Sequence, residues 1–283
     1  MVSASARRQQ VAFVSARGLS CRRACALFGV ARSSQAYKSK RAQSDEPIIA
    51  RMRSLSAQYP RFGYRFIRVF LQREGMEMST KRAHRLWRVA GLQVSKKKSR
   101  RRVAAARPRP QTATGANQVW AYDFVFDACA NGQTIKCLTV IDEWTRECLA
   151  IDVGSNIRGG RVIEVLSKLV SVHGAPKHLR SDNGPEFVSM AVISWLKEAG
   201  IETAFSAPGK PWQNGSDESF NGKFRNECLN IEWFRNRVEA AAIIETWREH
   251  FNSNRPHSSL SYLTPHAFKR QQNISTREAA RFH

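Results

Sequence analysis

The chain has 283 residues, 42% of them hydrophobic, which is enough for about two domains and at least one sizeable core. No apolar run approaches the ~18 residues that a membrane span needs, and the N-terminus has no apolar signal-peptide core, so neither a membrane span nor a secretory signal peptide is expected. The net charge of +23 indicates a polyanionic partner. The six cysteines show neither paired nor zinc-finger spacing, so free thiols in a reducing cytoplasm are expected.

The positive charge is concentrated at the start of the chain. Residues 1–110 hold 27 Lys and Arg but four acids, whereas residues 111–283 hold 19 bases and 19 acids. The basic part also carries regular apolar spacing, which a solvated tail would lack. A polyanion-binding half followed by a half with another role is therefore predicted.

Short helices are predicted over residues 1–38. Leu19, Ala24, Leu27 and Phe28 form an apolar stripe, and Gly29 breaks it before a polar second helix begins. This pattern is typical of a helix-turn-helix, with a plain helical hairpin as the alternative.

A second helical unit is predicted over residues 46–92, with a third helix from Lys81 to Ala90 capped by Ser79 or Thr80. Basic residues alternate with aromatic ones, which suits phosphate contact and stacking. The predicted DNA contacts of this unit are Arg61, Arg65, Lys81, Arg82 and Arg85.

A basic, proline-rich linker is predicted over residues 95–114, because the segment is too charged to fold alone. Such a segment can follow a DNA backbone and release counterions from it. Its predicted DNA contacts are Lys96, Lys97, Lys98, Arg100, Arg101 and Arg102.

From Asn117 the sequence becomes rich in strand patterns, and a mixed sheet covered by helices on both faces is predicted. The fold class is α/β. The expected strands are 119–126, 135–141, 148–153, 176–180 and 201–205, and the expected helices are 156–172, 189–199, 211–230 and 238–251.

Three acids lie at positions where the predicted strands and helices could bring them together. Asp123 lies in the first strand, Asp182 follows the fourth strand at an Asn183-Gly184 turn, and Glu218 lies on the helix after the fifth strand, with 35 residues between Asp182 and Glu218. Three carboxylates that converge in an α/β fold suit Mg²⁺ or Mn²⁺. Two such ions can support phosphodiester chemistry.

Six phrases of the sequence carry a family resemblance. They read VWAYDF (119–124), LTVIDEWTR (138–146), SDNGPEF (181–187), PGKPWQN (208–214), ESFNGKFRNECL (218–229) and NRPHSSL (254–260). With these phrases the sequence resembles DDE transposases and retroviral-type integrases, most closely the IS3 family of insertion-sequence transposases, OrfB type. The basic half also resembles that family's helix-turn-helix-like region.

The resemblance implies an RNase H-like core in which Asp123, Asp182 and Glu218 hold Mg²⁺ or Mn²⁺, two ions per site, and act as the catalytic triad. It implies strand cleavage at the element ends and strand transfer, acting on double-stranded DNA with terminal inverted repeats and on target DNA. A homo-oligomer on DNA, a possible upstream frameshift partner and a bacterial, nucleoid-associated location are further expectations. The expected segments are 1–44, helix-turn-helix-like; 45–94, DNA-binding; 95–114, linker; 115–272, catalytic core; and 273–283, tail.

Other acids remain open as metal ligands. Asp217 adjoins Glu218, but neighbours on a helix point ~100° apart, and the family motif favours Glu218. Asp127, Asp142 and Glu186 are further alternatives.

Polar residues near the acids are candidate DNA ligands, with solvated side chains as the alternative. His257 could position DNA or cap local structure. The predicted DNA contacts around the acids are Asn183, Lys210, Gln213, Asn214, Asn221, Lys223 and Arg225.

Two other functions remain as alternatives. One is an RNase H-like nuclease without strand transfer, and the other is a non-catalytic DNA-binding regulator. The large basic half disfavours the first, and the presence of all three acids disfavours the second.

Overall fold

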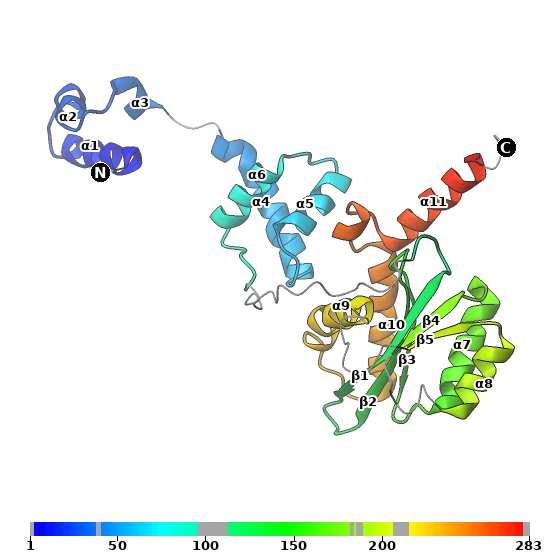
Figure 1. The fold of residues 1–283 in the computed structure, drawn as a ribbon. Coiled ribbons are helices and arrows are strands. Elements are labelled where there is room, and N and C mark those ends of the chain that lie inside the picture. The colour runs from blue at the N-terminus through cyan, green and yellow to red at the C-terminus, as the bar shows by residue number, and fades with distance from the viewer. Residues whose placement is uncertain are drawn as a thin grey trace, which may run out of the picture. The chain divides into compact units, whose positions relative to one another are not determined.

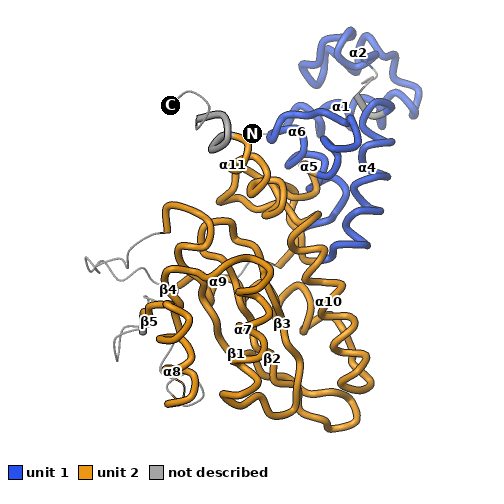
Figure 2. Tube along the Cα trace, turned by 90° about the vertical axis from the view of Figure 1, so that its right-hand side faces the viewer, with its two compact units in different colours: residues 1–60, 70–93 blue, residues 61–69, 94–283 orange. Residues whose placement is uncertain are grey.

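The structure, a computed structural model, describes residues 3–37, 41–95, 113–181, 184, 189–205 and 215–279. The chain forms two compact units, one of residues 1–60 and 70–93 and the other of residues 61–69 and 94–283 (Figure 2). Within the described residues, no helix combines the length and the apolar character needed to cross a membrane.

The first three helices confirm the expectation of short helices at the start of the chain. They are α1 (Ala4–Ala16), α2 (Cys21–Leu27) and α3 (Arg32–Ala36). Val11, Ala24 and Cys25 form their buried core, and Phe28 packs against it. The prediction of an apolar stripe is wrong for Leu27, whose side chain is exposed. The buried side of the seven-residue helix α2 is the side of Ala24 and Cys25.

Three longer helices follow, α4 (Arg41–Gln58), α5 (Tyr64–Arg73) and α6 (Thr80–Val89). The side chain of Ser79 accepts a hydrogen bond from the backbone N–H of Arg82 at 3.2 Å, so Ser79 is the predicted N-cap of α6. Leu86 and Trp87 are buried as predicted, whereas Val89 at the last position of the helix is exposed.

The second unit contains a five-stranded mixed sheet of order β3-β2-β1-β4-β5 (Figure 1). Strands β1, β2 and β3 pair antiparallel, and β4 and β5 extend the sheet in parallel from β1. The strands are β1 (Val119–Ala128), β2 (Thr134–Asp142), β3 (Cys148–Gly154), β4 (His178–Ser181) and β5 (Glu202–Phe205). The mixed sheet predicted from the sequence is confirmed.

Helices cover both faces of the sheet, also as predicted (Figure 1). Helices α7 and α8 pack on one face, and α9, the π-helix η2 and α10 pack on the other. Their bounds are α7 (Gly159–His173), α8 (Met190–Glu198), α9 (Gly215–Phe224), η2 (Arg225–Leu229) and α10 (Arg237–Ser253), followed by η3 (Ser258–Leu260) and α11 (Pro265–Ala279). Helix α11 is not predicted by the sequence patterns.

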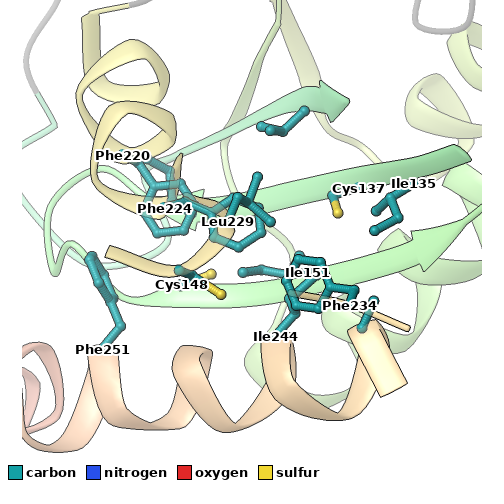
Figure 3. Packing of buried hydrophobic residues seen from close by; sticks show 14 of the residues in the cluster. Ile135, Cys137, Cys148, Ile151, Phe220, Phe224, Leu229, Phe234, Ile244 and Phe251 are labelled. Atoms are coloured by element: carbon teal, nitrogen blue, oxygen red, sulfur yellow. The ribbon is translucent and has the colours of Figure 1, made fainter. Parts of the chain in front are cut away.

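Alternation along β1 decides which side chains meet which helices. Trp120 and Tyr122 enter the core under α7 and α8. Ala121 and Val125 enter the core under α9 and α10, where Phe220, Phe224 and Phe251 supply most of the aromatic surface (Figure 3). Asp123 stands between Ala121 and Val125 in this alternation, so its side chain belongs to the face that α9 covers.

Candidate active site

Asp123 is half-buried at the middle of β1, and hydrogen bonds fix the direction of its carboxylate. Oδ1 accepts the backbone N–H of Phe124 at 2.8 Å. Oδ2 accepts a hydrogen bond from Nδ2 of Asn221, also at 2.8 Å. Because Asn221 lies on α9, this second bond joins the central strand directly to the helix that carries Glu218.

Thr139 lies opposite Asp123 in the antiparallel partner strand β2. Its hydroxyl is 3.1 Å from the backbone oxygen of Asp123 and 3.3 Å from Oδ1 of Asn221. Thr139 is fully buried and Asn221 is 9% exposed. The three residues therefore form a shielded polar group under α9.

Glu218 and Asp217 have opposite environments in the first turn of α9. Asp217 is 1% exposed and lies on the face of the helix that also buries Phe220 and Phe224. Glu218 is exposed, and Asn221 follows it by three residues, a spacing that puts their Cβ atoms roughly 5–6 Å apart. Of the two neighbours, Glu218 is the acid that faces solvent, and it lies on the helix that Asn221 joins to Asp123.

The end of β4 lies beside Asp123. The parallel register pairs Ala121 of β1 with Arg180 of β4, and β4 ends one residue later at Ser181. Asp182 follows Ser181 in the chain and lies outside the described residues, as does Glu186. The described strand thus leads to the sequence position at which the sequence predicts the second acid.

Among the described residues, the carboxylates of Asp123 and Glu218 are of a chemical type that suits a hard divalent cation. Asp123 and Glu218 offer carboxylate oxygens, the ligands that Mg²⁺ and Mn²⁺ prefer. Among the described residues no group of three or more His, Cys, Asp or Glu side chains is gathered for a metal, and Asp182 lies outside these residues.

Two of the alternative acids have local roles. Oδ1 of Asp142 accepts hydrogen bonds from the backbone of Trp144 and Thr145 at 2.9 and 2.8 Å, and Oδ2 accepts one from the backbone of Asn117 at 2.8 Å. Asp142 therefore stabilises the turn after β2, and the interpretation of it as a metal ligand is wrong. Asp127 shares the face of Asp123, and its Oδ1 accepts a hydrogen bond from the backbone N–H of Ala128.

Three predicted DNA contacts on and after α9 have partners within the protein. Asn221 bonds Asp123, and Nζ of Lys223 donates to the backbone oxygen and the hydroxyl of Ser219 at 3.0 and 2.8 Å. Nη1 of Arg225 donates to the backbone oxygen of Phe126 at 3.2 Å. Burial, with the nearby Arg255, lowers the pKa of Lys223 to about 8. Their contacts with DNA remain predictions.

Two of the predicted DNA contacts of the helical unit form ion pairs with one buried acid. Asp45 is paired with Arg82 at 2.8 Å and with Arg85 at 2.7 Å, and the hydrogen bond from Arg85 lowers the pKa of the Asp45 carboxyl. Lys81, which lies on α6 with Arg82 and Arg85, is exposed.

The remaining predicted contacts divide into two groups. Arg61 and Arg65 are exposed, and Arg65 lies over the ring of Tyr64. The others fall outside the described residues: Lys96, Lys97, Lys98, Arg100, Arg101, Arg102, Asn183, Lys210, Gln213 and Asn214.

Arg255 and Glu227 form a buried ion pair that the sequence did not predict, at the π-helix η2 that follows α9. Nε and Nη2 of Arg255 donate to the two carboxylate oxygens of Glu227 in η2, both at 2.6 Å. The guanidinium lies 5.0–5.6 Å from the ring centres of Phe62, Phe66 and Phe251. Phe62 is 5% exposed, so its ring is packed inside the protein. The only sequence signal was that Arg255 and Glu227 both belong to phrases of the family resemblance.

His257 is buried beneath the same helices. Its Nε2 lies 3.4 Å from the backbone oxygen of Phe251, whose ring meets the imidazole edge-on. Burial, with the charge of Arg255, lowers the pKa of His257 to about 3. A neutral buried imidazole packs α10 against the segment that follows it and is not placed to touch DNA.

Two overlapping stretches of the sequence, which together cover the sheet and its covering helices, match known protein families. Residues 113–211 and 199–265 match family models described as an integrase core domain, and residues 43–102 match an HTH-like domain. The chain is thus a protein with an integrase-type core and an HTH-like region.

Relatives define the family more closely. The chain is 41% identical over 264 residues to the insertion element IS407 uncharacterized 31.7 kDa protein of Burkholderia multivorans, covering 93% of this chain and 95% of that protein. It is 28% identical over 223 residues to the transposase for insertion sequence element IS904 of Lactococcus lactis, covering 74% and 88%. The chain belongs to the IS3 family of insertion-sequence transposases.

Solved structures include a distant likeness. The HTLV-2 integrase catalytic core domain in complex with magnesium is 17% identical, with a TM-score of 0.42 over 54% of this chain and 96% of that one.

Proposed function

We propose that this protein is a DNA transposase that cleaves strands at the ends of its insertion sequence and joins the freed 3′-OH ends to target DNA. The proposed catalytic and metal-binding residues are Asp123, Asp182 and Glu218. The observation that carries the proposal is the hydrogen bond from Asn221 to Asp123, because it brings the helix of Glu218 against the central strand.

Each acid has a proposed part in holding the cation. Asp123, half-buried and oriented by two N–H donors, is the fixed ligand. Glu218, exposed on the first turn of α9, closes the site from the solvent side. Asp182 is proposed to complete it from the end of β4, which the parallel pairing brings alongside β1. Rigid strands and a packed helix are the elements on which such a site keeps its geometry.

The acids suit Mg²⁺ or Mn²⁺, with two ions per site proposed. The chemistry that such ions supply when bound is activation of the attacking oxygen and stabilisation of the leaving oxygen of the phosphodiester. The protein's own residues hold the negative charges that gather the cations, and they keep the reacting DNA strand in line with them. No buried histidine is needed as a base, in agreement with the lowered pKa of His257.

The proposed substrate is double-stranded DNA, first the terminal inverted repeats of the element and then the target. The excess of Lys and Arg in the first 110 residues and the match to an HTH-like domain at residues 43–102 support DNA binding by that part of the chain. We further propose that the protein acts as a homo-oligomer on DNA in the bacterial cytoplasm, where an upstream frameshift product is a possible partner.

Product analysis tests this function. A labelled duplex that carries the terminal repeat of the element is incubated with the protein, Mg²⁺ and a plasmid target. The expected product is the labelled strand joined to the plasmid. Release of a shortened strand without joining supports the nuclease alternative, and retention of the duplex with neither reaction supports the regulator. Either result overturns the proposal.

A further inference from the structure

The polar group under α9 combines three residues from separate parts of the chain. Asp123 comes from β1, Thr139 from β2 and Asn221 from α9. Asp123 and Asn221 are 98 residues apart in sequence, and Thr139 and Asn221 are 82 apart. Such a contact forms only when α9 is seated on the sheet.

The orientation of the Asn221 amide is dictated by the carboxylate of Asp123. An ionised carboxylate only accepts hydrogen bonds, so the NH₂ group must face Oδ2 of Asp123 at 2.8 Å. The amide oxygen then faces the hydroxyl of Thr139 at 3.3 Å, which can donate to it. The reverse orientation would set two acceptors against each other at Asp123, so Asp123 selects the amide orientation. The single hydroxyl proton of Thr139 is shared between Oδ1 of Asn221 and the backbone oxygen of Asp123 at 3.1 Å, and Thr139 supports this orientation without selecting it.

The chemistry of the amide suits a support for a metal ligand. A Lys or Arg at this place would fix Asp123 but would bring a positive charge that competes with a cation. An Asp or Glu at this place would repel the carboxylate of Asp123. A neutral N–H donor fixes the carboxylate and leaves its negative charge in place. Burial of Asn221 and Thr139 excludes water that would otherwise compete for these bonds.

We infer that Asn221, supported by Thr139, is a positioning residue that holds Asp123 in the direction needed to bind the divalent cation. The inference rests on the proposed function, since it assigns a role to a residue beside a proposed metal ligand. It also gives Asn221 a role different from the DNA contact that its place on α9 predicts. Partners that orient metal-binding side chains typically contribute about 10–100-fold to metal affinity.

Mn²⁺ binding to the full-length protein tests the inference without relying on activity. Free Mn²⁺ is measured by electron paramagnetic resonance during titration, and thermal unfolding of each variant is followed in parallel. Asn221→Ala is expected to weaken Mn²⁺ binding about tenfold or more. Thr139→Val, which keeps the side-chain shape but removes the hydroxyl, is expected to weaken it less, and Thr139→Ser is expected to restore binding.

Asn252 supplies the matched control. It is a fully buried Asn whose amide bonds the backbone N–H and C=O of Cys148 at 2.8 and 2.9 Å, away from Asp123. Asn252→Ala is expected to lower the midpoint of unfolding and to leave Mn²⁺ affinity unchanged. If Asn221→Ala behaves in the same way, Asn221 serves packing alone and the inference is overturned.

Asp123→Asn separates failure of this inference from failure of the proposed function. If this variant binds Mn²⁺ as the wild type does, Asp123 is not a metal ligand and the proposed function fails first. If it loses Mn²⁺ binding while Asn221→Ala and Thr139→Val retain wild-type affinity, the proposed function stands and the positioning role is wrong.

Discussion

Nη1 of Arg180 lies 2.6 and 2.7 Å from the two carboxylate oxygens of Glu143, and both residues are buried. Glu143 directly follows β2, and Arg180 is the third residue of β4. The pair therefore ties the end of β4 to the turn after β2. Because Asp182 comes two residues after Arg180, this tie fixes the strand end that leads to the proposed second acid.

Removing one partner of this pair should destabilise the fold strongly. Glu143→Gln removes the negative charge that Glu143 places against the buried guanidinium of Arg180, and we expect the free energy of unfolding to fall by about 3–5 kcal/mol in urea denaturation. The double variant Arg180→Met/Glu143→Leu should recover most of that loss, because neither buried charge remains. Glu164→Gln is the control, since Glu164 pairs with Arg161 and Lys168 at the surface, and its substitution should lower the free energy of unfolding far less. Equal effects of Glu143→Gln and Glu164→Gln would contradict the account.

His257 should make the protein sensitive to acid. The unfolded chain protonates this imidazole near its ordinary pKa of 6.5, whereas burial keeps the folded pKa at about 3. Between these values the unfolded state binds more protons, so the free energy of unfolding must fall as the pH falls from 6.5 towards 3. His257→Asn should show a shallower decline over that window when both proteins are unfolded with urea at a series of pH values. Parallel declines would show that His257 does not titrate as its burial implies.

The thiols should differ sharply in reactivity. All six cysteines are free, as the sequence predicts, and five of them are buried. Burial raises the pKa of Cys137 and of Cys228 to about 12, so few of these thiols form the reactive thiolate. Titration with an aromatic disulfide reagent should detect one fast thiol in the native protein, that of the exposed Cys21, and six after unfolding. The fast phase should disappear in Cys21→Ser; its persistence would mean that a buried cysteine is accessible.

Local patterns were sufficient to predict the sheet and its helices. The strand patterns over residues 119–126 and 135–141 predicted β1 and β2, and the helical pattern over residues 156–172 predicted α7. Those signals lie within one element or between adjacent ones. They also placed Asp123 and Glu218 on the elements that the structure joins through Asn221.

The contacts between distant elements could not be predicted. Asn221 has the spacing from Glu218 that suits either a DNA contact or an internal bond, and only the packing of α9 on β1 distinguishes them. Helix α11 could not be predicted for the same reason. It is held by Lys269 and His266, which pair with Glu147 at 2.8 and 3.3 Å, and by Phe268 against Trp144, all of which depend on the fold.

The most direct test of the account is strand transfer by Asp123→Asn. The substituted amide has nearly the same shape, and its oxygen can still accept the hydrogen bond from Asn221, while its NH₂ group then replaces the oxygen that accepts from the backbone N–H of Phe124. Folding, checked by thermal unfolding, and the gel-shift of a terminal-repeat duplex should stay close to those of the wild type. Joining of a pre-cleaved 3′-OH end to plasmid DNA in Mg²⁺ should fall by at least about 1000-fold, the scale on which loss of one catalytic group acts. Joining within about tenfold of the wild type would contradict the claim that Asp123 is a catalytic metal ligand.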